Sequence, residues 1–353
     1  MSWFKNSEDH VFRIRRKRLL GLDIGSSMVK LVELETTSQK LTVNTAAQAP
    51  IEVSVDPATA TPVYNAANAV RHCLLASAAR VRKAACAVGG PQVAVRRFAF
   101  ASLKAGELPQ AVRMEAAQSC PFDMDKSVVG YHVVKKCSAG WPVKRRLQHE
   151  GLLVAAVKDA VQQKEQIAGA AGADCVLMDA EGLAVLNCLT ACGRLPQEGT
   201  TIVANVGSTN TNVIVTAPGA VPCIRDLRHD TSCAVGGLTD DRLLGCDRPR
   251  SVDTWLASLC ERLAREIDYT VRFCAAEDRL PPVQETLLCG GLVLSDGFVR
   301  CLEERIGRHC AVWNPFMDLG CSRRVESAGM FERGPAFAVA TGLALRRLGD
   351  IYD

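Results

Sequence analysis

Short apolar runs that end in small polar residues alternate along the chain with longer segments in which apolar residues recur every three or four positions. The first run, LLGLDIGSSMVKLVELE at residues 19–35, predicts a strand, a turn on DIGSS and a second strand. Residues 65–83 carry a helical period, with one face made by Val70, Cys73, Leu74, Ser77 and Val81. The pattern therefore predicts an α/β fold that opens with a hairpin and a helix packed on a sheet.

The pattern changes between residues 91 and 172. Strands and helices are predicted there at QVAVRRFAF, LPQAVRMEAAQSC, VVGYHVVKK, GLLVAAV and KDAVQQKEQIAGAAG, which suggests a compact α+β module inserted into a larger fold. The strand-then-helix pattern returns at 173–195, and TTIVANVGSTNTNVIVTA begins a second half after residue 199. Residues 251–276 predict the longest helix, because they carry one apolar stripe.

The opening hairpin occurs twice. Shifting the sequence by 182 residues aligns LDIGSSMVKLVE with ANVGSTNTNVIV, and so pairs Asp23 with Asn205, Gly25 with Gly207, Ser26 with Ser208 and Ser27 with Thr209. Two glycine–hydroxyl turns that face each other can hold a polyphosphate, because glycine lets the backbone approach while N–H and hydroxyl groups donate to phosphate oxygens. An aspartate at the strand end can hold Mg²⁺ through its bound waters.

A third glycine turn, CGGLVLSDG at residues 289–297, follows a strand-like run and precedes a helical segment. Its backbone can pass close beneath a nucleoside, and a helix N-terminus favours anions. Three turns in this order, two of them repeated, indicate a nucleotide site. The chain has no G-x-x-x-x-G-K, no G-x-G-x-x-G after a strand and no H-E-x-x-H, and its six histidines form no local cluster.

Composition limits the possible functions. The chain has 353 residues, 48% of them apolar, which is enough for a buried core and two domains. The net charge of +4 is too mild and too evenly spread for nucleic acid to be the main partner. No run approaches 18 apolar residues, and the N-terminus lacks the pattern of a secretory signal. We therefore expect a cytoplasmic protein.

Residues 1–18 contain the one dense basic run, FRIRRKR, close to Trp3 and Phe4. A solvated leader is one interpretation, and contact with an anionic membrane surface is the other.

Sixteen cysteines are present, but no C-x-x-C occurs and most lie inside apolar runs. We expect them to act as small buried hydrophobes, with metal binding or redox chemistry as the alternative.

Taken in order, these segments resemble the PilM family of pilus-assembly proteins, which belongs to the actin-like ATPases and is similar to the cell-division protein FtsA. The resemblance extends from Leu19 to Leu348. It is carried by LLGLDIGSSMVKLVELE, SCPFDMDKSVVGYHVV, GLLVAAVKD, AAGADCVLMDAEGLAVL, ANVGSTNTNVIV, LAREIDYTVRF, LLCGGLVLSDGFVRCLEERIG, VWNPF and AVATGLALR.

The resemblance implies an α/β, actin-like (ribonuclease H-type) fold with two lobes and an inserted FtsA-type α+β module. The implied parts are a basic leader at 1–18, a first lobe at 19–90 and 173–195, the module at 91–172, and a second lobe at 199–348 that includes a 236–280 subdomain. It also implies ATP and Mg²⁺ in the cleft.

The implied role is in the inner-membrane platform of type IV pili or a related secretion system. Family members hold the cytoplasmic N-terminal tail of the membrane protein PilN, in a groove expected here between the module and the first lobe. This partner would keep the protein peripheral to the inner membrane, and self-association is left open.

Several positions match the family's nucleotide site. They are Asp23, Gly25, Ser26 and Ser27 in the first phosphate turn, Gly207, Ser208 and Thr209 in the second, Gly236 and Gly237 in a later stretch, and Gly290 and Gly291 in the adenosine turn. Lys30 is either a phosphate neighbour or an exposed strand lysine. Asp23 is also the candidate for Mg²⁺, held through water.

Three positions depart from the family pattern. Asn205 stands where the second turn normally has aspartate, which removes a ligand for magnesium-bound water. Leu292 stands where the adenosine turn usually has a third glycine, and its side chain can narrow the base pocket. Leu238 replaces an asparagine that commonly follows the two glycines before it.

These departures favour nucleotide binding over efficient hydrolysis, because activating water needs a placed acid or base. The candidates near the expected hinge are Asp179 and Glu181, which can equally be a helix cap and a first-turn carboxylate. Asp23 and Glu181 are the candidate catalytic residues.

Two other functions stay open. An actin-fold small-molecule kinase needs a general base for the acceptor hydroxyl, and no acid in a glycine-rich setting stands out in the first lobe beyond the phosphate turn. An FtsA-like filament former usually ends in an amphipathic membrane helix, whereas this sequence ends in RRLGDIYD. We predict a scaffold in which ATP closes the lobes and tunes the peptide groove.

Overall fold

The computed structural model describes residues 19–37, 40–52, 54, 61–101, 103, 106–134, 148–229, 250–278 and 280–346. The basic leader and the predicted site residues Gly236 and Gly237 lie outside these ranges. Among the described helices, none is long and apolar enough to cross a membrane.

A first five-stranded sheet has the order β3 (Lys40–Pro50), β2 (Met28–Thr37), β1 (Leu20–Ile24), β4 (Lys83–Val88) and β8 (Asp174–Ala180). The first three strands pair antiparallel, and β4 and β8 continue the sheet in parallel. Helices α1 (Pro62–Ser77) and α3 (Lys158–Ala170) cover one face, and α4 (Glu181–Ala191) and α10 (Ala338–Ala344) cover the other. Strand β1 is buried along its whole length because helices lie on both faces.

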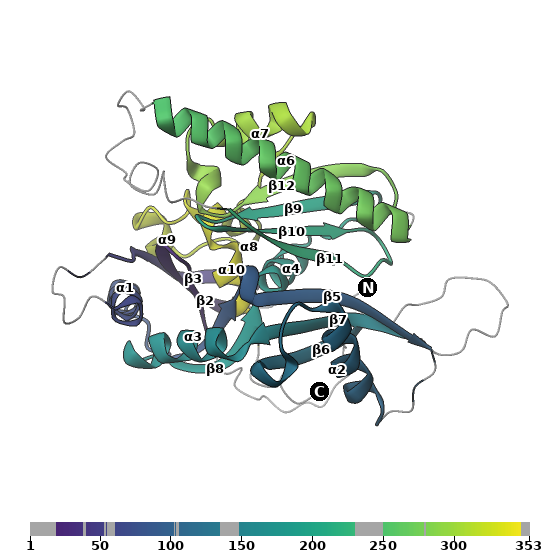
Figure 1. Cartoon of the computed structure of the whole chain (residues 1–353). Helices are drawn as coiled ribbons and strands as arrows, with labels where there is room; N and C mark the ends of the chain where they lie inside the picture. Colours follow the sequence, from purple (N-terminus) through teal and green to yellow (C-terminus); the bar gives the residue numbers. More distant parts are fainter. Residues whose placement is uncertain are drawn as a thin grey trace.

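A second sheet repeats this order with β11 (Cys223–Arg228), β10 (Asn210–Thr216), β9 (Thr200–Val206), β12 (Val283–Cys289) and β13 (Ala311–Val312). The long helix α6 (Arg250–Asp278) and α7 (Phe298–Ile306) cover its outer face, at the top of Figure 1. Its inner face packs against α4, so one apolar cluster reaches from the first sheet to the second. The two lobes therefore have the same topology, and α4 packs between their sheets.

The repeat predicted from the sequence is confirmed in three dimensions. Asp23 pairs with Lys30 across β1 and β2, and Asn205 pairs with Asn212 at the equivalent register of β9 and β10. Both turns close with the same backbone bond, from Gly25 N to the Met28 carbonyl at 3.0 Å and from Gly207 N to the Asn210 carbonyl at 2.9 Å.

The inserted segment forms a three-stranded antiparallel sheet of β5 (Val93–Ala101), β7 (Gln148–Val157) and β6 (Ser127–Val134), at the lower right of Figure 1. Helix α2 (Leu108–Ser119) closes its own small core. Helix α3 packs mainly on α1, β4 and β8, so it lies with the first lobe and not with the segment 91–172 to which the sequence pattern assigns it.

The C-terminal helices also cross between the lobes. α8 (Pro315–Leu319), α9 (Arg323–Ser327), η5 (Gly334–Phe337) and α10 follow the second sheet in the chain but pack on the first. The range 199–348 expected for the second lobe therefore includes the cover of the first sheet. The remaining short turns are η1 (Gly90–Gln92), η2 (Met124–Lys126) and η4 (Gly291–Leu294).

The first helix is shorter than the period predicts. It begins at Pro62 after the capping residue Thr61, and it ends at Ser77 because Ala78 is left-handed (φ 43°). Val81 thus lies beyond the helix, close to the start of β4.

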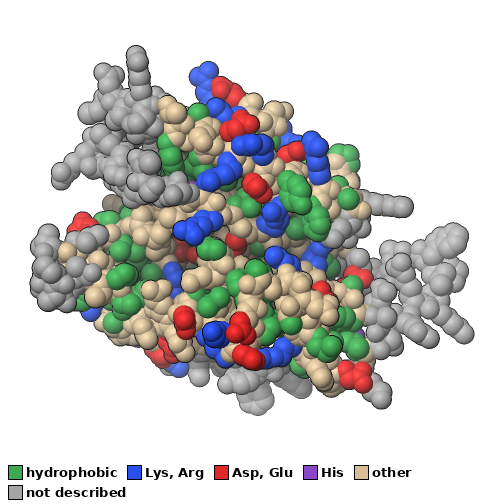
Figure 2. Space-filling model, in the orientation of Figure 1, with side chains coloured by type: hydrophobic (Ala, Val, Ile, Leu, Met, Phe, Trp, Pro, Cys, Tyr) green, Lys and Arg blue, Asp and Glu red, His purple; other side chains and the backbone are tan. Residues whose placement is uncertain are grey.

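The surface is mixed in charge. On the face shown in Figure 2, Lys and Arg side chains alternate with Asp and Glu over the described residues, without a broad field of one sign. The described cysteines form no disulfide, and most of them are buried.

Two glycines allow β1, α10 and α4 to approach closely. A Cβ at Gly21 would lie 1.8 Å from the Ala340 carbonyl oxygen, and a Cβ at Gly342 would lie 1.8 Å from the Ala184 carbonyl oxygen. Because the blocking atoms are backbone, a side chain at either position has to separate the helices between the lobes.

Gly342→Ala is expected to lower the free energy of unfolding by about 1–3 kcal/mol, through overpacking of α10 on α4. Urea denaturation would measure the change. The matched control is Gly169→Ala in α3, where nothing lies within 4 Å of a new Cβ, and where alanine is expected to stabilise by roughly 0.5–1 kcal/mol. Equal midpoints for Gly342→Ala and wild type would contradict the close packing.

Candidate functional site

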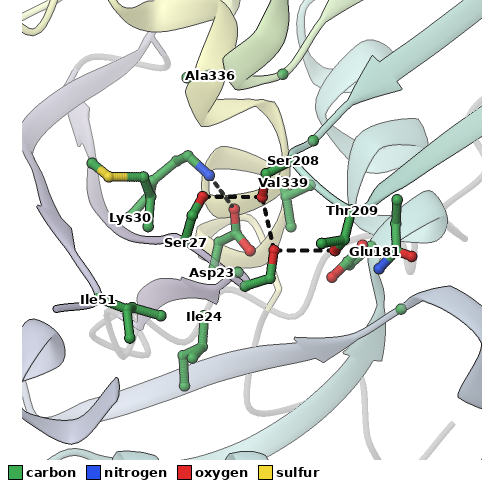
Figure 3. A pocket seen from close by; sticks show the side chains of 18 of the residues that line it. Asp23, Ile24, Ser27, Lys30, Ile51, Glu181, Ser208, Thr209, Ala336 and Val339 are labelled. Carbon is green, nitrogen blue, oxygen red and sulfur yellow. Dashed lines mark hydrogen bonds and ion pairs between the residues drawn. The ribbon is translucent and has the colours of Figure 1, made fainter. Parts of the chain in front are cut away.

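A cavity of about 680 Å³ lies between the two lobes, where the three glycine turns converge. It is lined by every predicted site residue within the described ranges, namely Asp23, Gly25, Ser26, Ser27, Lys30, Glu181, Asn205, Gly207, Ser208, Thr209, Gly290 and Gly291. Figure 3 shows several of these side chains from the two lobes converging. The volume is in the range of small-molecule and cofactor sites.

The two glycine–hydroxyl turns, expected from the sequence to hold phosphate, touch each other through their hydroxyl groups. The Oγ atoms of Ser26 and Ser208 are 2.7 Å apart, Ser27 Oγ donates to Ser208 Oγ at 3.0 Å, and Thr209 Oγ1 donates to Ser26 Oγ at 3.0 Å (Figure 3). A hydroxyl rotates freely between donor and acceptor roles. These four groups can therefore turn towards the oxygens of an anion placed between the lobes.

The first half of the site carries an ion pair. Lys30 Nζ lies 3.1 Å from Asp23 Oδ2, and the two side chains are only 14% and 9% exposed. Lys30 is therefore a cavity residue and not an exposed strand lysine. A second lysine, Lys164 of α3, donates from Nζ to the Ile24 carbonyl.

The second half replaces this ion pair by a neutral chain of amides at the same register. Asn205 Nδ2 donates to Asn212 Oδ1 at 2.7 Å, and Asn212 Nδ2 donates to Asp226 Oδ1 at 2.8 Å. Burial raises the pKa of Asp226 to about 6, against the stabilising bonds from Asn212 and the Gly90 N–H. The second half therefore offers amides where the first offers a carboxylate.

Glu181 begins α4 and directs its carboxyl group at Gly89, where a Cβ would lie 2.2 Å from that group. Burial, and next the negative charge of Asp23, raise the pKa of Glu181 to about 7, while Lys164 opposes the shift. The neutral form of this carboxyl group therefore persists to higher pH than that of an exposed glutamate.

Asp179, the other acid near the hinge, has a structural role. Its Oδ2 accepts from Arg346 Nε at 2.7 Å, and its Oδ1 accepts from the Ala180 N–H at 2.8 Å. The N-cap position of α4 is Ala180, so neither acid caps that helix. Of the two candidates, only Glu181 lines the cavity.

The third turn requires glycine at Gly290. Its φ is +99°, and a Cβ would lie 2.4 Å from the Val206 carbonyl oxygen of the neighbouring strand. Leu292 is 6% exposed and belongs to the apolar core of the second lobe, at the cavity wall. Its packing in that core explains how leucine is accommodated where a glycine was expected.

Sequence reasoning missed the residues that helices and late loops bring to the cavity. They include Pro62, Asn65, Gln163, Lys164 and Arg333. No repeat or motif marks them, because only the packing of α1, α3 and η5 at the cleft edge places them there.

The two lobes of equal topology, the paired hairpins and the central cleft define a protein of the actin-like ATPase fold. The family model for type IV pilus assembly protein PilM matches residues 21–231 and 249–348, so the chain belongs to this family.

Three solved structures illustrate the similarity. The "PilM-PilN type IV pilus biogenesis complex" matches at 25% identity with a TM-score of 0.74. The match covers 94% of this chain and 98% of that chain. The ethanolamine utilization protein EutJ from Carboxydothermus hydrogenoformans matches with 13% identity, coverage of 95% and 92%, and a TM-score of 0.49. An archaeal actin homologue matches with 14% identity, coverage of 93% and 98%, and a TM-score of 0.45.

Glu181→Gln is expected to stabilise the protein increasingly as the pH rises. The raised pKa means that the stabilising contribution of the Glu181 carboxyl is present below about 4.5, its ordinary value, and is lost as the pH rises to about 7. The free energy of unfolding of the variant should exceed that of wild type by about 1–3 kcal/mol at pH 8, with no difference near pH 4.5.

Asp226→Asn serves as the comparison. Its pKa is raised from 3.8 to about 6, so its pH-dependent gain should begin and level off at lower pH. Chemical denaturation from about pH 3.5 to about pH 8.5 would show both curves. A difference between Glu181→Gln and wild type that stays constant with pH would contradict the buried-carboxyl assignment.

Proposed function

We propose that this chain is a nucleotide-binding scaffold of type IV pilus assembly, which binds ATP between its lobes and the cytoplasmic N-terminal tail of a PilN-like membrane protein. The main support is the similarity over 94% of the chain to a structure of the PilM–PilN complex. The family match favours this scaffold over a division-ring filament or a small-molecule kinase. The partner would hold the protein peripheral to the inner membrane.

The geometry of the cavity fits a nucleoside triphosphate. Hydroxyl groups from both turns would donate hydrogen bonds to the phosphate oxygens. Lys30 and Lys164 would supply positive charge on the side of the first lobe. Gly290 packs closely on β9 and has no side chain, so the adenosine of the nucleotide would lie against bare backbone at this turn.

The residues also fit a hydrated Mg²⁺ on one side of the cleft. Asp23 and Glu181 both line the cavity. Burial is the largest cause of the raised pKa of Glu181 and the charge of Asp23 the next, as expected for carboxyl groups that would gain from a shared cation. Bound Mg²⁺ would neutralise phosphate charge there. Asn205 offers no carboxylate on the other side, because its amide bonds Asn212.

Hydrolysis is expected to be slow or absent. Glu181 is the acid with a pKa near neutrality at the cavity wall, so it is the candidate to accept a proton from water. With Asn205 in place of the second aspartate, no second carboxylate faces it from the second turn.

The peptide groove is proposed at the junction of the inserted segment and the first lobe. From the elements at this junction, β6, β7, α3 and β8, half-buried apolar side chains pack on the central apolar cluster, namely Val134, Val154, Val157, Val161, Val176 and Leu177. β8 is an edge strand of the first sheet. An extended peptide can pair with such an edge while its apolar side chains enter the valine-lined groove.

The ATP site is tested by calorimetric titration of ATP and Mg²⁺ into wild type and Gly25→Val. Gly25 lines the cavity, and a Cβ there would lie 2.8 Å from the Met28 carbonyl oxygen, so valine would displace the backbone of the first turn. We expect binding to weaken more than about tenfold. Gly130→Val on β6, where nothing lies within 4 Å of a new Cβ, is the control and should bind normally. No heat from wild type near 100 μM protein would indicate a degenerate site.

The groove is tested with a fluorescent peptide that copies the cytoplasmic tail of the PilN-like protein of the same genome. Val176→Asp should weaken binding about tenfold or more, because it places a charge in the apolar groove. Val312→Asp is the matched control, since Val312 is 46% exposed on β13, the equivalent edge strand of the other sheet. Equal loss in both variants, or no loss in Val176→Asp, would exclude this groove.

A further inference from the structure

His229 follows β11 and lies directly against the second phosphate turn (residues 207–209). It is 2% exposed and is not among the cavity-lining residues. Its ring Nε2 is 3.0 Å from the Gly207 carbonyl oxygen, and its backbone N–H donates to the Thr209 carbonyl oxygen at 2.9 Å. One residue therefore contacts two carbonyls of the same turn.

The carbonyl contact shows that the ring nitrogen Nε2 carries a hydrogen. A carbonyl oxygen only accepts, so Nε2 must carry the hydrogen and donate it to Gly207. Nδ1 is then free to accept from Thr211 Oγ1, which lies 3.5 Å away. Burial, with the nearby charge of Arg262 as a smaller cause, lowers the pKa of His229 and favours this neutral ring.

Holding this carbonyl also orients the next N–H group. The Gly207 carbonyl and the Ser208 N–H belong to one planar trans peptide, in which the two groups point in opposite directions. Because the imidazole holds the carbonyl on the His229 side, the Ser208 N–H points the other way. Both Gly207 and Ser208 line the cavity and His229 does not, so an N–H directed away from His229 is expected to face the cavity.

The first turn lacks this side-chain bond. Its equivalent backbone contact runs from the Ile51 N–H to the Ser27 carbonyl at 2.8 Å, 182 residues before the Thr209 carbonyl. Isoleucine has no side-chain donor, so the first turn can receive only the backbone bond from this position. The hydrogen bond from the imidazole of His229 thus occurs only in the second of the two turns, the one that has Asn205 at the position equivalent to Asp23.

We propose that His229 is a positioning residue for nucleotide binding: its imidazole holds the Gly207 carbonyl away from the cleft and thereby presents the Ser208 N–H to a phosphate oxygen. This inference rests on the proposed ATP site and adds to it a hydrogen bond from the backbone of the second turn to the phosphate. A fixed N–H donor to a charged phosphate binds without the carboxylate and metal that an aspartate at position 205 would use.

The test compares His229→Ala, His229→Gln and His149→Ala by calorimetry with ATP and with adenosine. His149 is the matched control, because its Nε2 contacts the Leu103 carbonyl at 3.3 Å in the inserted segment, away from the cleft. His229→Ala should weaken ATP binding about tenfold and leave adenosine binding unchanged, since a hydrogen bond to a charged group is lost. His229→Gln retains a side-chain N–H donor and should recover most of the ATP affinity, and His149→Ala should match wild type.

Two outcomes would overturn the inference. One is unchanged ATP binding in a folded His229→Ala protein. The other is an equal loss of ATP and adenosine binding, which would show that His229 only supports the fold. If His229→Ala does not fold, His229→Asn replaces it, because the shorter amide does not reach Gly207. A wild-type protein that binds no ATP would contradict the proposed nucleotide site itself, and this inference with it.

Discussion

Antiparallel pairing in the two hairpins is the constraint on which the site depends. The backbone ladder sets Asp23 opposite Lys30 and Asn205 opposite Asn212, and it closes both turns with the same N–H to carbonyl bond. A slip of one residue would turn every side chain to the other face of its sheet. The hydroxyls of the two turns meet across the cleft only because both hairpins keep this register.

The two hairpins have the same shape but different electrostatics. The first holds a partly buried ion pair and is approached by Lys164. The second holds a chain of amides that ends at Asp226, whose pKa is raised by burial. Positive charge for an anion therefore comes from the first lobe. The second lobe contributes backbone groups of its turn, and the hydrogen bond from His229 to the Gly207 carbonyl orients them.

The helices between the sheets connect the site to the rest of the protein. α4 carries Glu181 at its first turn and packs on α10, which also lies on β1. Gly21 and Gly342 make this approach possible, since a Cβ at either would meet backbone. A change in the angle between the lobes must repack this interface. Residues of β6, β7, α3 and β8, at the junction of the inserted segment with the first lobe, pack on the same apolar cluster as α4 and α10.

Local sequence was sufficient for the elements of the site. Alternation and the 182-residue repeat predicted both hairpins and their turns, because pairing register and glycine chemistry are properties of neighbouring residues. The period of residues 251–276 predicted the long α6 for the same reason. Sequence patterns could not place Lys164, Asp226 or His229 beside the turns, or assign α3 and α10 to the first sheet. Those positions depend on which apolar faces pack together, and that packing is decided by the burial of surface from segments far apart in the chain.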